Sequence, residues 1–297
     1  SCPLAYLYSN KVRIQAPNQT DEGFDVMQQG SLMHLCYELF GKKIKESGNR
    51  STDMDELYEL MFQISLEAYD YPETVSNREN GENIHHQIFL STLQAGLKDE
   101  INAGLLAKFV DYYMENASLL EYFQNTEFEK GFALNNELKS YEIKDEYDRN
   151  YFIRGFIDRF DNLESRVNVI DYKSKKISAK SGKHKETQEK VDDLKDVQLA
   201  LYILYVKQAY PGKAYYSSML SFKGESKAAH FAELFDAGFD DSYETKLKQI
   251  IFDTKEGIGN GEFGFNNSDE KACGWCDYKF ICHEGVLGKN LNLEENM

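Results

Sequence analysis

The chain lacks any run of about 20 apolar residues, which a membrane-spanning helix requires, and no signal-peptide pattern opens it. We therefore expect a cytoplasmic protein. Positive charge is also in short supply: 34 Lys and Arg residues face 50 Asp and Glu residues, giving a net charge of −16. This balance argues against a protein that coats nucleic acid by bulk electrostatics. It leaves open a protein that binds nucleic acid in a groove, because only the groove lining must be positive.

What the chain does contain is enough apolar material for a folded core. Hydrophobic residues make up 41% of its 297 residues, including 20 Tyr and 19 Phe, so the protein is globular. The length suits one large domain or two modest ones. The sequence starts at Ser1 without an initiator methionine. It is therefore expected to be a segment of a longer protein, although tag removal or processing would give the same start.

Two apolar-rich stretches, Gly155–Asp161 and Val167–Lys173, predict adjacent strands separated by a turn near 161–162. Residues i and i+2 of a strand share a face, so Asp171 and Lys173 are expected to project together while Tyr172 points away. Asp158 would lie beside them. Two carboxylates and a lysine can form a metal-and-water site; the alternative is a surface ion pair with no function.

Helices are predicted before these strands, over about residues 1–125. Residues 30–40 carry apolar side chains on one helical face, with Cys36 in the core and His34 at the edge of the face. His34 is either a structural residue or a metal ligand. Asp53 is expected to cap a second helix, and 84–123 contains no proline and predicts one long helix or two.

Strand character returns at 128–134 and 139–143, and we expect both segments to join the two central strands in a mixed or antiparallel sheet. Glu129 either faces the site or lies exposed at the sheet edge. Further elements are a helix over 197–209, ended by Pro211-Gly212, a strand over 215–222 and a helix over 239–252. Within the helix, Gln198 and Tyr202 are four residues apart and share a face. The order predicts an α/β fold.

Lysines are concentrated directly after the second central strand, within a polar segment that predicts a loop over 177–195. They are Lys173, Lys175, Lys176, Lys180, Lys183 and Lys185. The group is either a solvated loop or a set of phosphate contacts beside the carboxylates.

The tail contains Cys273-Gly-Trp-Cys276 followed by Cys282, a spacing that indicates metal or redox chemistry in a reducing compartment. Three thiolates need a fourth ligand. His283 would complete a zinc site, whereas Cys2 would complete an iron-sulfur cluster. The spacing alone leaves both possibilities open.

Taken together, these features resemble the RecB-like branch of the PD-(D/E)xK nuclease superfamily, particularly its members with an iron-sulfur cluster. Such members include the nuclease domain of AddB and the CRISPR-associated RecB-like exonucleases. The matching motifs occur in the order of the family and cover nearly the whole chain. They are Cys2-Pro3, Gly-x-x-x-His (30–34), Gly-x-Ile-Asp-Arg-x-Asp (155–161), Asp-Tyr-Lys (171–173), Gln-x-x-x-Tyr (198–202) and the closing cysteines.

The resemblance implies a single nuclease domain over 1–297, with a restriction-endonuclease-like core: a central mixed sheet flanked by helices. Its parts would be a helical region (1–125), the core sheet (126–225), and a last helix with a tail that binds the cluster (226–297). A [4Fe-4S] cluster would join the two termini. Its implied ligands are Cys2, Cys273, Cys276 and Cys282.

The resemblance also assigns roles in a metal-dependent deoxyribonuclease. Mg²⁺ or Mn²⁺ would be held by His34, Asp158, Asp171 and the backbone carbonyl of Tyr172. Lys173 would position water or stabilise charge, and Gln198 and Tyr202 would contact the cleaved strand or brace the lysine. The implied DNA-binding residues are Lys175, Lys176 and Lys180.

The biological role expected from the resemblance is an exonuclease in a helicase-nuclease that acts on double-strand breaks, with DNA and a helicase domain or subunit as partners. The missing methionine fits an excised C-terminal nuclease domain. The alternatives are a stand-alone CRISPR-associated exonuclease and a catalytically weak module that clamps DNA or serves as a scaffold.

Overall fold

The chain divides into two compact units, Asp21–Leu247 and Ser1–Thr20 with Lys248–Met297. The computed structural model describes residues 2–14, 26–48, 53–70, 84–98, 104–115, 124–132, 141–145, 147–173, 194, 196–223, 230–234, 239–263, 276, 278 and 282. None of the helices in these ranges is both long and apolar enough to cross a membrane.

The first half of the larger unit is helical, as predicted. Its helices are α2 (Val26–Ser47), α3 (Met54–Tyr69), α4 (Ile84–Gln94) and α5 (Leu105–Glu115). Asp53 caps α3 by accepting a hydrogen bond from the backbone N–H of Asp55 at 2.9 Å. The proline-free region 84–123 contains two helices, α4 and α5, rather than one. Its last residues, 116–123, lie outside the described residues.

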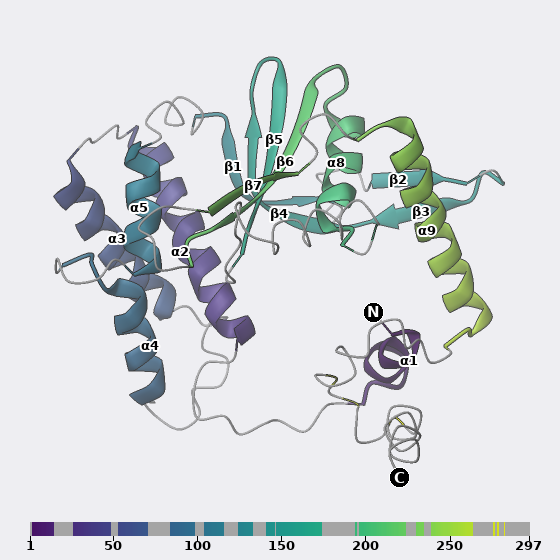
Figure 1. Ribbon diagram of the computed structural model, residues 1–297, viewed down its shortest axis with the longest axis horizontal. Helices are drawn as coiled ribbons and strands as arrows, with labels where there is room; N and C mark the ends of the chain where they lie inside the picture. The colour runs from purple at the N-terminus through teal and green to yellow at the C-terminus, as the bar shows by residue number, and fades with distance from the viewer. Residues whose placement is uncertain are drawn as a thin grey trace, which may run out of the picture. The chain divides into compact units, whose positions relative to one another are not determined.

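A five-stranded mixed sheet forms the centre of this unit (Figure 1). Its strands, in spatial order, are β1 (Thr126–Phe132), β4 (Gly155–Asn162), β5 (Arg166–Tyr172), β6 (Ala214–Ser221) and β7 (His230–Leu234). β5 and β6 pair in parallel and the other neighbours are antiparallel. The connection between β5 and β6 includes α8 (Gln198–Ala209), the predicted helix.

The prediction for residues 139–143 was wrong in one respect. They do form a strand, β2 (Tyr141–Lys144), but it pairs with β3 (Asn150–Ile153) in a separate two-stranded sheet. The outer edges of the two central strands are paired with other strands, β4 with β1 and β5 with β6. The predicted turn at 161–162 is also shifted, because β4 continues through Asn162 and the chain reverses at 163–165.

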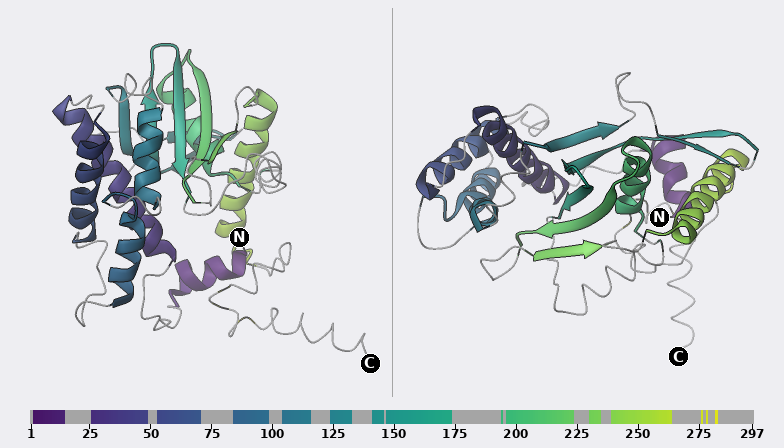
Figure 2. Two further views of the ribbon diagram at one scale, coloured as in Figure 1. Left: turned by 60° about the vertical axis from the view of Figure 1, so that its left-hand side comes forward. Right: turned by 90° about the horizontal axis from the view of Figure 1, so that it is seen from above.

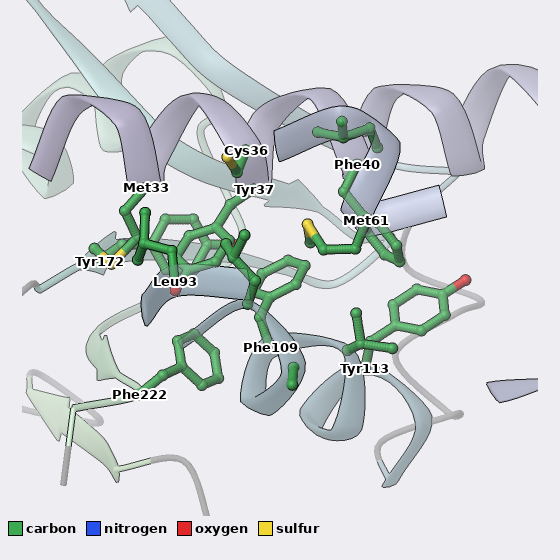
Figure 3. Packing of buried hydrophobic residues seen from close by; sticks show 14 of the residues in the cluster. Met33, Cys36, Tyr37, Phe40, Met61, Leu93, Phe109, Tyr113, Tyr172 and Phe222 are labelled. Atoms are coloured by element: carbon green, nitrogen blue, oxygen red, sulfur yellow. The ribbon is translucent and has the colours of Figure 1, made fainter. Parts of the chain in front are cut away.

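Helices cover both faces of the sheet. Figures 1 and 2 show α2 to α5 grouped on one side and α8 on the other. On the first side, the ring of Tyr37 stacks on Phe109 with centroids 4.2 Å apart and meets Tyr172 edge-on, as Figure 3 shows. On the second side, Phe132 stacks on Tyr205 of α8. The central mixed sheet flanked by helices confirms the predicted fold class.

Helix α2 and strand β1 approach closely at Gly41. A Cβ atom there would lie 2.0 to 2.6 Å from atoms of the Phe128 ring. Both residues are fully or almost fully buried. The contact is therefore possible only without a side chain at position 41.

The smaller unit joins the two ends of the sequence. It contains α1 (Pro3–Tyr6), a π-helix η1 (Leu7–Val12) and the later part of α9 (Asp241–Asn260). The Tyr8 and Tyr278 rings lie 5.5 Å apart, and the Tyr278 hydroxyl donates to the carbonyl of Ile14 at 3.2 Å. Aromatic residues near the first cysteine thus pack against the cysteine-bearing tail.

Candidate metal centre

The site begins where β4 and β5 separate. Their backbone pairing ends at Arg159 and Ile170. Beyond that point the carboxylate of Asp158 accepts the backbone N–H of Tyr172 at 2.7 Å. The Asp158 side chain thus accepts a hydrogen bond where backbone pairing has ended. This bond holds Asp158 at the point where β4 and β5 diverge.

Three potential metal ligands meet at this point: His34 from α2, Glu129 from β1 and Asp158 from β4. One ligand atom from each lies within 4.8 Å of the other two, and no other such group of His, Cys, Asp and Glu side chains occurs among the described residues. Oxygen ligands with one imidazole suit Mn²⁺ and, less readily, Mg²⁺. The donor set fits such an ion.

Of the two alternatives for Glu129, the structure supports the one in which it faces the site, and its interpretation as an exposed edge carboxylate is wrong. It is half-buried and has a φ angle of +46°, in the left-handed region that residues other than glycine rarely adopt. The backbone reversal coincides with a missing pair between β1 and β4, opposite Asp158. Left-handed backbone of this kind concentrates at functional sites.

The Tyr172 carbonyl is the fourth candidate ligand. The Nε2 atom of His34 lies 3.0 Å from this oxygen, a hydrogen-bonding distance. Adjacent ligands of an octahedral ion with bonds of about 2.1 Å are separated by about 3.0 Å. The spacing of His34 and Tyr172 therefore fits two neighbouring positions on one ion.

Burial controls the protonation of these ligands. It lowers the pKa of His34, so the imidazole is neutral and available for metal binding at neutral pH. Burial, reinforced by the charge of Asp158, raises the pKa of Glu129 to about 7. Burial and the neighbouring charge of Asp171 raise the pKa of Asp158 as well. Binding of a cation favours the ionised form of such a cluster of carboxyl groups with raised pKa values.

Beside the ligands lies a connected row of polar side chains, predicted from sequence to lie together. The Nζ atom of Lys173 is 2.6 Å from an Asp171 carboxylate oxygen and donates to Gln198 Oε1 at 3.0 Å. Gln198 Nε2 in turn donates to the Tyr202 hydroxyl at 3.0 Å. The row fixes the lysine from two sides.

A comparison with known protein families agrees with a nuclease site of this kind. A model of the PD-(D/E)XK nuclease superfamily matches residues 1–283. The chain belongs to this superfamily. Membership indicates a metal-dependent nuclease with a restriction-endonuclease-like fold, and Mg²⁺ or Mn²⁺ as the typical metal. No curated protein matches the chain.

A buried ion pair lies next to the nuclease site on β4. Arg159 and Asp161 are almost completely buried and pair at 2.9 Å. Thr126 of β1 donates to the same carboxylate at 2.6 Å. The motif at 155–161 includes both residues, but their burial was not predicted, because charged residues in a strand are usually exposed.

The remaining predicted site residues lie either outside the described residues or in the smaller unit. Cys273 and the lysines Lys175, Lys176 and Lys180 lie outside the described residues. Cys2, Cys276 and Cys282 all belong to the smaller unit. Gly30, at the start of the predicted Gly-x-x-x-His motif, has nothing within 4 Å of the position of a Cβ atom.

Proposed function

We propose that the protein is a metal-dependent deoxyribonuclease that removes nucleotides from DNA ends. The observation that carries this proposal is the meeting of His34, Glu129 and Asp158 directly beside the row that runs from Asp171 to Tyr202. Ligands for a cation thus adjoin a fixed ammonium group, and both a cation and an ammonium group can stabilise the charge that develops in phosphodiester hydrolysis.

The proposed ligands of Mg²⁺ or Mn²⁺ are His34, Glu129, Asp158, Asp171 and the carbonyl of Tyr172. The chemistry supplied by the bound ion is a lowered pKa of water and neutralisation of phosphate charge. Asp171 is nearly fully buried and its pKa is raised by burial, opposed by Lys173. Lys173 and a bound metal ion would each favour the ionised form of this carboxylate.

Lys173 is the group proposed to act on the phosphate. An ammonium group has three N–H donors. Gln198 accepts from one of them and Asp171 forms an ion pair with the group, so the ammonium group can still donate to a phosphate oxygen or to the attacking water. Burial raises the pKa of Tyr202 to about 12, so its hydroxyl stays protonated and holds Gln198 in place.

The test is cleavage of single-stranded DNA with Mn²⁺. Wild type is expected to release mononucleotides from linear DNA and to leave circular single-stranded DNA intact. Asp171→Ala is expected to abolish this activity and Lys173→Ala to lower it at least about 100-fold, whereas Lys246→Ala, which removes an exposed lysine from α9, is the matched control. If wild type and both site variants are equally inert, the protein is instead a DNA clamp or scaffold.

We also propose a [4Fe-4S] cluster held by Cys2, Cys273, Cys276 and Cys282. The support is that the two ends of the sequence form one compact unit, with Tyr8 packed on Tyr278 between the cysteine-bearing segments. Protein purified without oxygen is expected to be brown and to contain about four iron atoms per chain. Cys276→Ser should lose iron and soluble protein; colourless, zinc-loaded wild type would contradict the cluster.

A helicase partner is proposed to deliver the DNA, because a net charge of −16 gives the isolated chain little general attraction for it. The native gene tests this context. A helicase-like region encoded before Ser1 would support a helicase-nuclease, and its absence would favour the stand-alone CRISPR-associated alternative.

A further inference from the structure

The hairpin that leads into β4 carries the most exposed aromatic rings of the larger unit. Tyr147, Phe152 and Phe156 are 71%, 64% and 51% exposed, more than any other described aromatic residue. Figure 1 shows β2 and β3 extending from the start of β4 as this hairpin. Large exposed rings gathered in one segment indicate a binding surface.

Phe152, Arg154 and Phe156 alternate with half-buried residues along β3 and the start of β4. Alternate residues of an extended chain share a face, so two rings flank one guanidinium at steps of about 7 Å. We call these three residues the aromatic strip. The described residues provide no ion pair or hydrogen bond for the Arg154 side chain.

The strip leads to the metal ligands. Asp158 is the next alternate residue after Phe156, about 7 Å further along the strand. Gly155 faces Phe132 and Tyr202 on the α8 side, so Phe156 points to the opposite side. That is the side of the sheet covered by α2, from which His34 reaches Asp158.

Two features leave the aromatic strip accessible and hold its hairpin in place. The residue paired with Phe156 on β1 is Gly131, which places no side chain beside the ring. At the other end, Asp145 holds the hairpin turn by accepting from Tyr147 N, Arg149 N and Tyr151 Oη at 2.9 to 3.0 Å. A rigid platform loses little conformational freedom when a ligand stacks on it.

We propose that the aromatic strip binds the unpaired nucleic-acid strand that enters the metal centre. Bases stack on Phe152 and Phe156, and Arg154 contacts a phosphate between them. Within a duplex the faces of each base are covered by the neighbouring base pairs, whereas bases of a single strand can stack on aromatic rings, so the strip selects single-stranded over duplex DNA. This inference rests on the proposed nuclease function, since it assigns the path of the substrate to that site.

Binding is tested first, apart from cleavage, by fluorescence anisotropy of labelled (dT)20 with Ca²⁺ in place of Mn²⁺. Phe152→Ala/Phe156→Ala is expected to weaken binding at least about tenfold, since each stacked base is worth about 5-fold or more. Phe152→Tyr/Phe156→Tyr should restore affinity. Ile88→Ala, which removes an exposed apolar side chain from α4, should leave affinity unchanged.

Arg154→Gln tests the phosphate contact. It should reduce the slope of log affinity against log salt concentration by about 0.7, the value for one phosphate of a single strand. An unchanged slope would remove Arg154 from the binding surface.

A small chromogenic phosphodiester, bis(p-nitrophenyl) phosphate, separates the two proposals. It can reach the metal centre but is too short to contact the strip, so wild type and Phe152→Ala/Phe156→Ala should hydrolyse it at the same rate. Wild type that cleaves neither this ester nor DNA would refute the nuclease function. A double alanine variant that binds (dT)20 as tightly as wild type would refute the strip, whether or not the protein cleaves.

Discussion

The carboxylate of Asp158 accepts the backbone N–H of Tyr172 at 2.7 Å, just past the last backbone pair between β4 and β5. One side chain thus closes the end of a strand ladder and faces a metal site. These two duties can be separated by mutation, because an amide keeps the acceptor oxygen and loses the charge.

Asp158→Asn is therefore expected to unfold at nearly the wild-type urea concentration while losing metal binding and cleavage. Asp158→Ala should lose about 1–3 kcal/mol of stability as well, since the Tyr172 N–H is left buried without an acceptor. Urea unfolding followed by circular dichroism measures both. Equal stability of the two variants would contradict a structural role for the carboxylate.

Glu129 combines a metal-facing carboxylate with a strained backbone. Glu129→Gln is expected to weaken Mn²⁺ binding at least about tenfold without loss of stability. Glu129→Gly should weaken binding similarly but raise stability by about 1 kcal/mol, because glycine adopts a φ of +46° without strain. Calorimetric titration with Mn²⁺ and thermal unfolding test the two effects. Metal affinity that survives both changes would exclude Glu129 from the site.

The difference between Lys173 and its neighbours gives a kinetic prediction. Lys173→Ala should lower the single-turnover cleavage rate about 100- to 1,000-fold, the cost of removing one charge-stabilising donor. Gln198→Ala leaves the ammonium group in place but loses its support, so a smaller loss is expected. Both variants should bind Mn²⁺ normally. Impaired metal binding in Lys173→Ala would show that the residue organises the ligands rather than the phosphate.

The raised pKa of Glu129, about 7, predicts how the metal-free protein responds to pH. Between the ordinary value of 4.5 and about 7, the folded state binds more protons than the unfolded state. Stability must therefore fall as pH rises through this window. Glu129→Gln should show a flatter dependence of melting temperature on pH. Mn²⁺ should stabilise wild type more at pH 8 than at pH 5.5, because protons compete for the same carboxylates.

The buried pair of Arg159 and Asp161 predicts a large effect on folding. Arg159→Met should cost about 3–5 kcal/mol by leaving a buried carboxylate without its cation. Arg159→Met/Asp161→Leu should cost less than the sum of the single changes. Lys42→Met, which removes an exposed pair with Glu38 one helical turn away, should cost only about 0.3–0.5 kcal/mol. Urea unfolding of these three variants and of Asp161→Leu provides the values.

Sequence patterns predicted the parts of the site that depend on local periodicity. Alternation along β5 placed Asp171 and Lys173 together, and helical spacing placed Gln198 and Tyr202 together. The family resemblance supplied His34, whose position beside the amphipathic face was ambiguous by itself. These residues occupy regular strands and helices, in which the spacing along the chain determines the direction of the side chain.

The remainder depended on tertiary structure. Glu129 enters the site through one reversed φ angle, which breaks the alternation that a sequence pattern assumes. The burial of Arg159 and the separate pairing of β2 with β3 depend on the pairing of β1 with β4. Each of these outcomes requires knowledge of a distant neighbour, β1, which no local pattern contains.

The contact between Gly41 and Phe128 affects the positions of the metal ligands, although neither residue takes part in the chemistry. His34 lies seven residues earlier on the same helix, about 10 Å along its axis, and Glu129 follows Phe128 directly on β1. A single added methyl group would wedge the two elements apart and with them two of the metal ligands. Gly41→Ala is therefore expected to be inactive, like variants of the acids and the lysine, although glycine carries no reactive group.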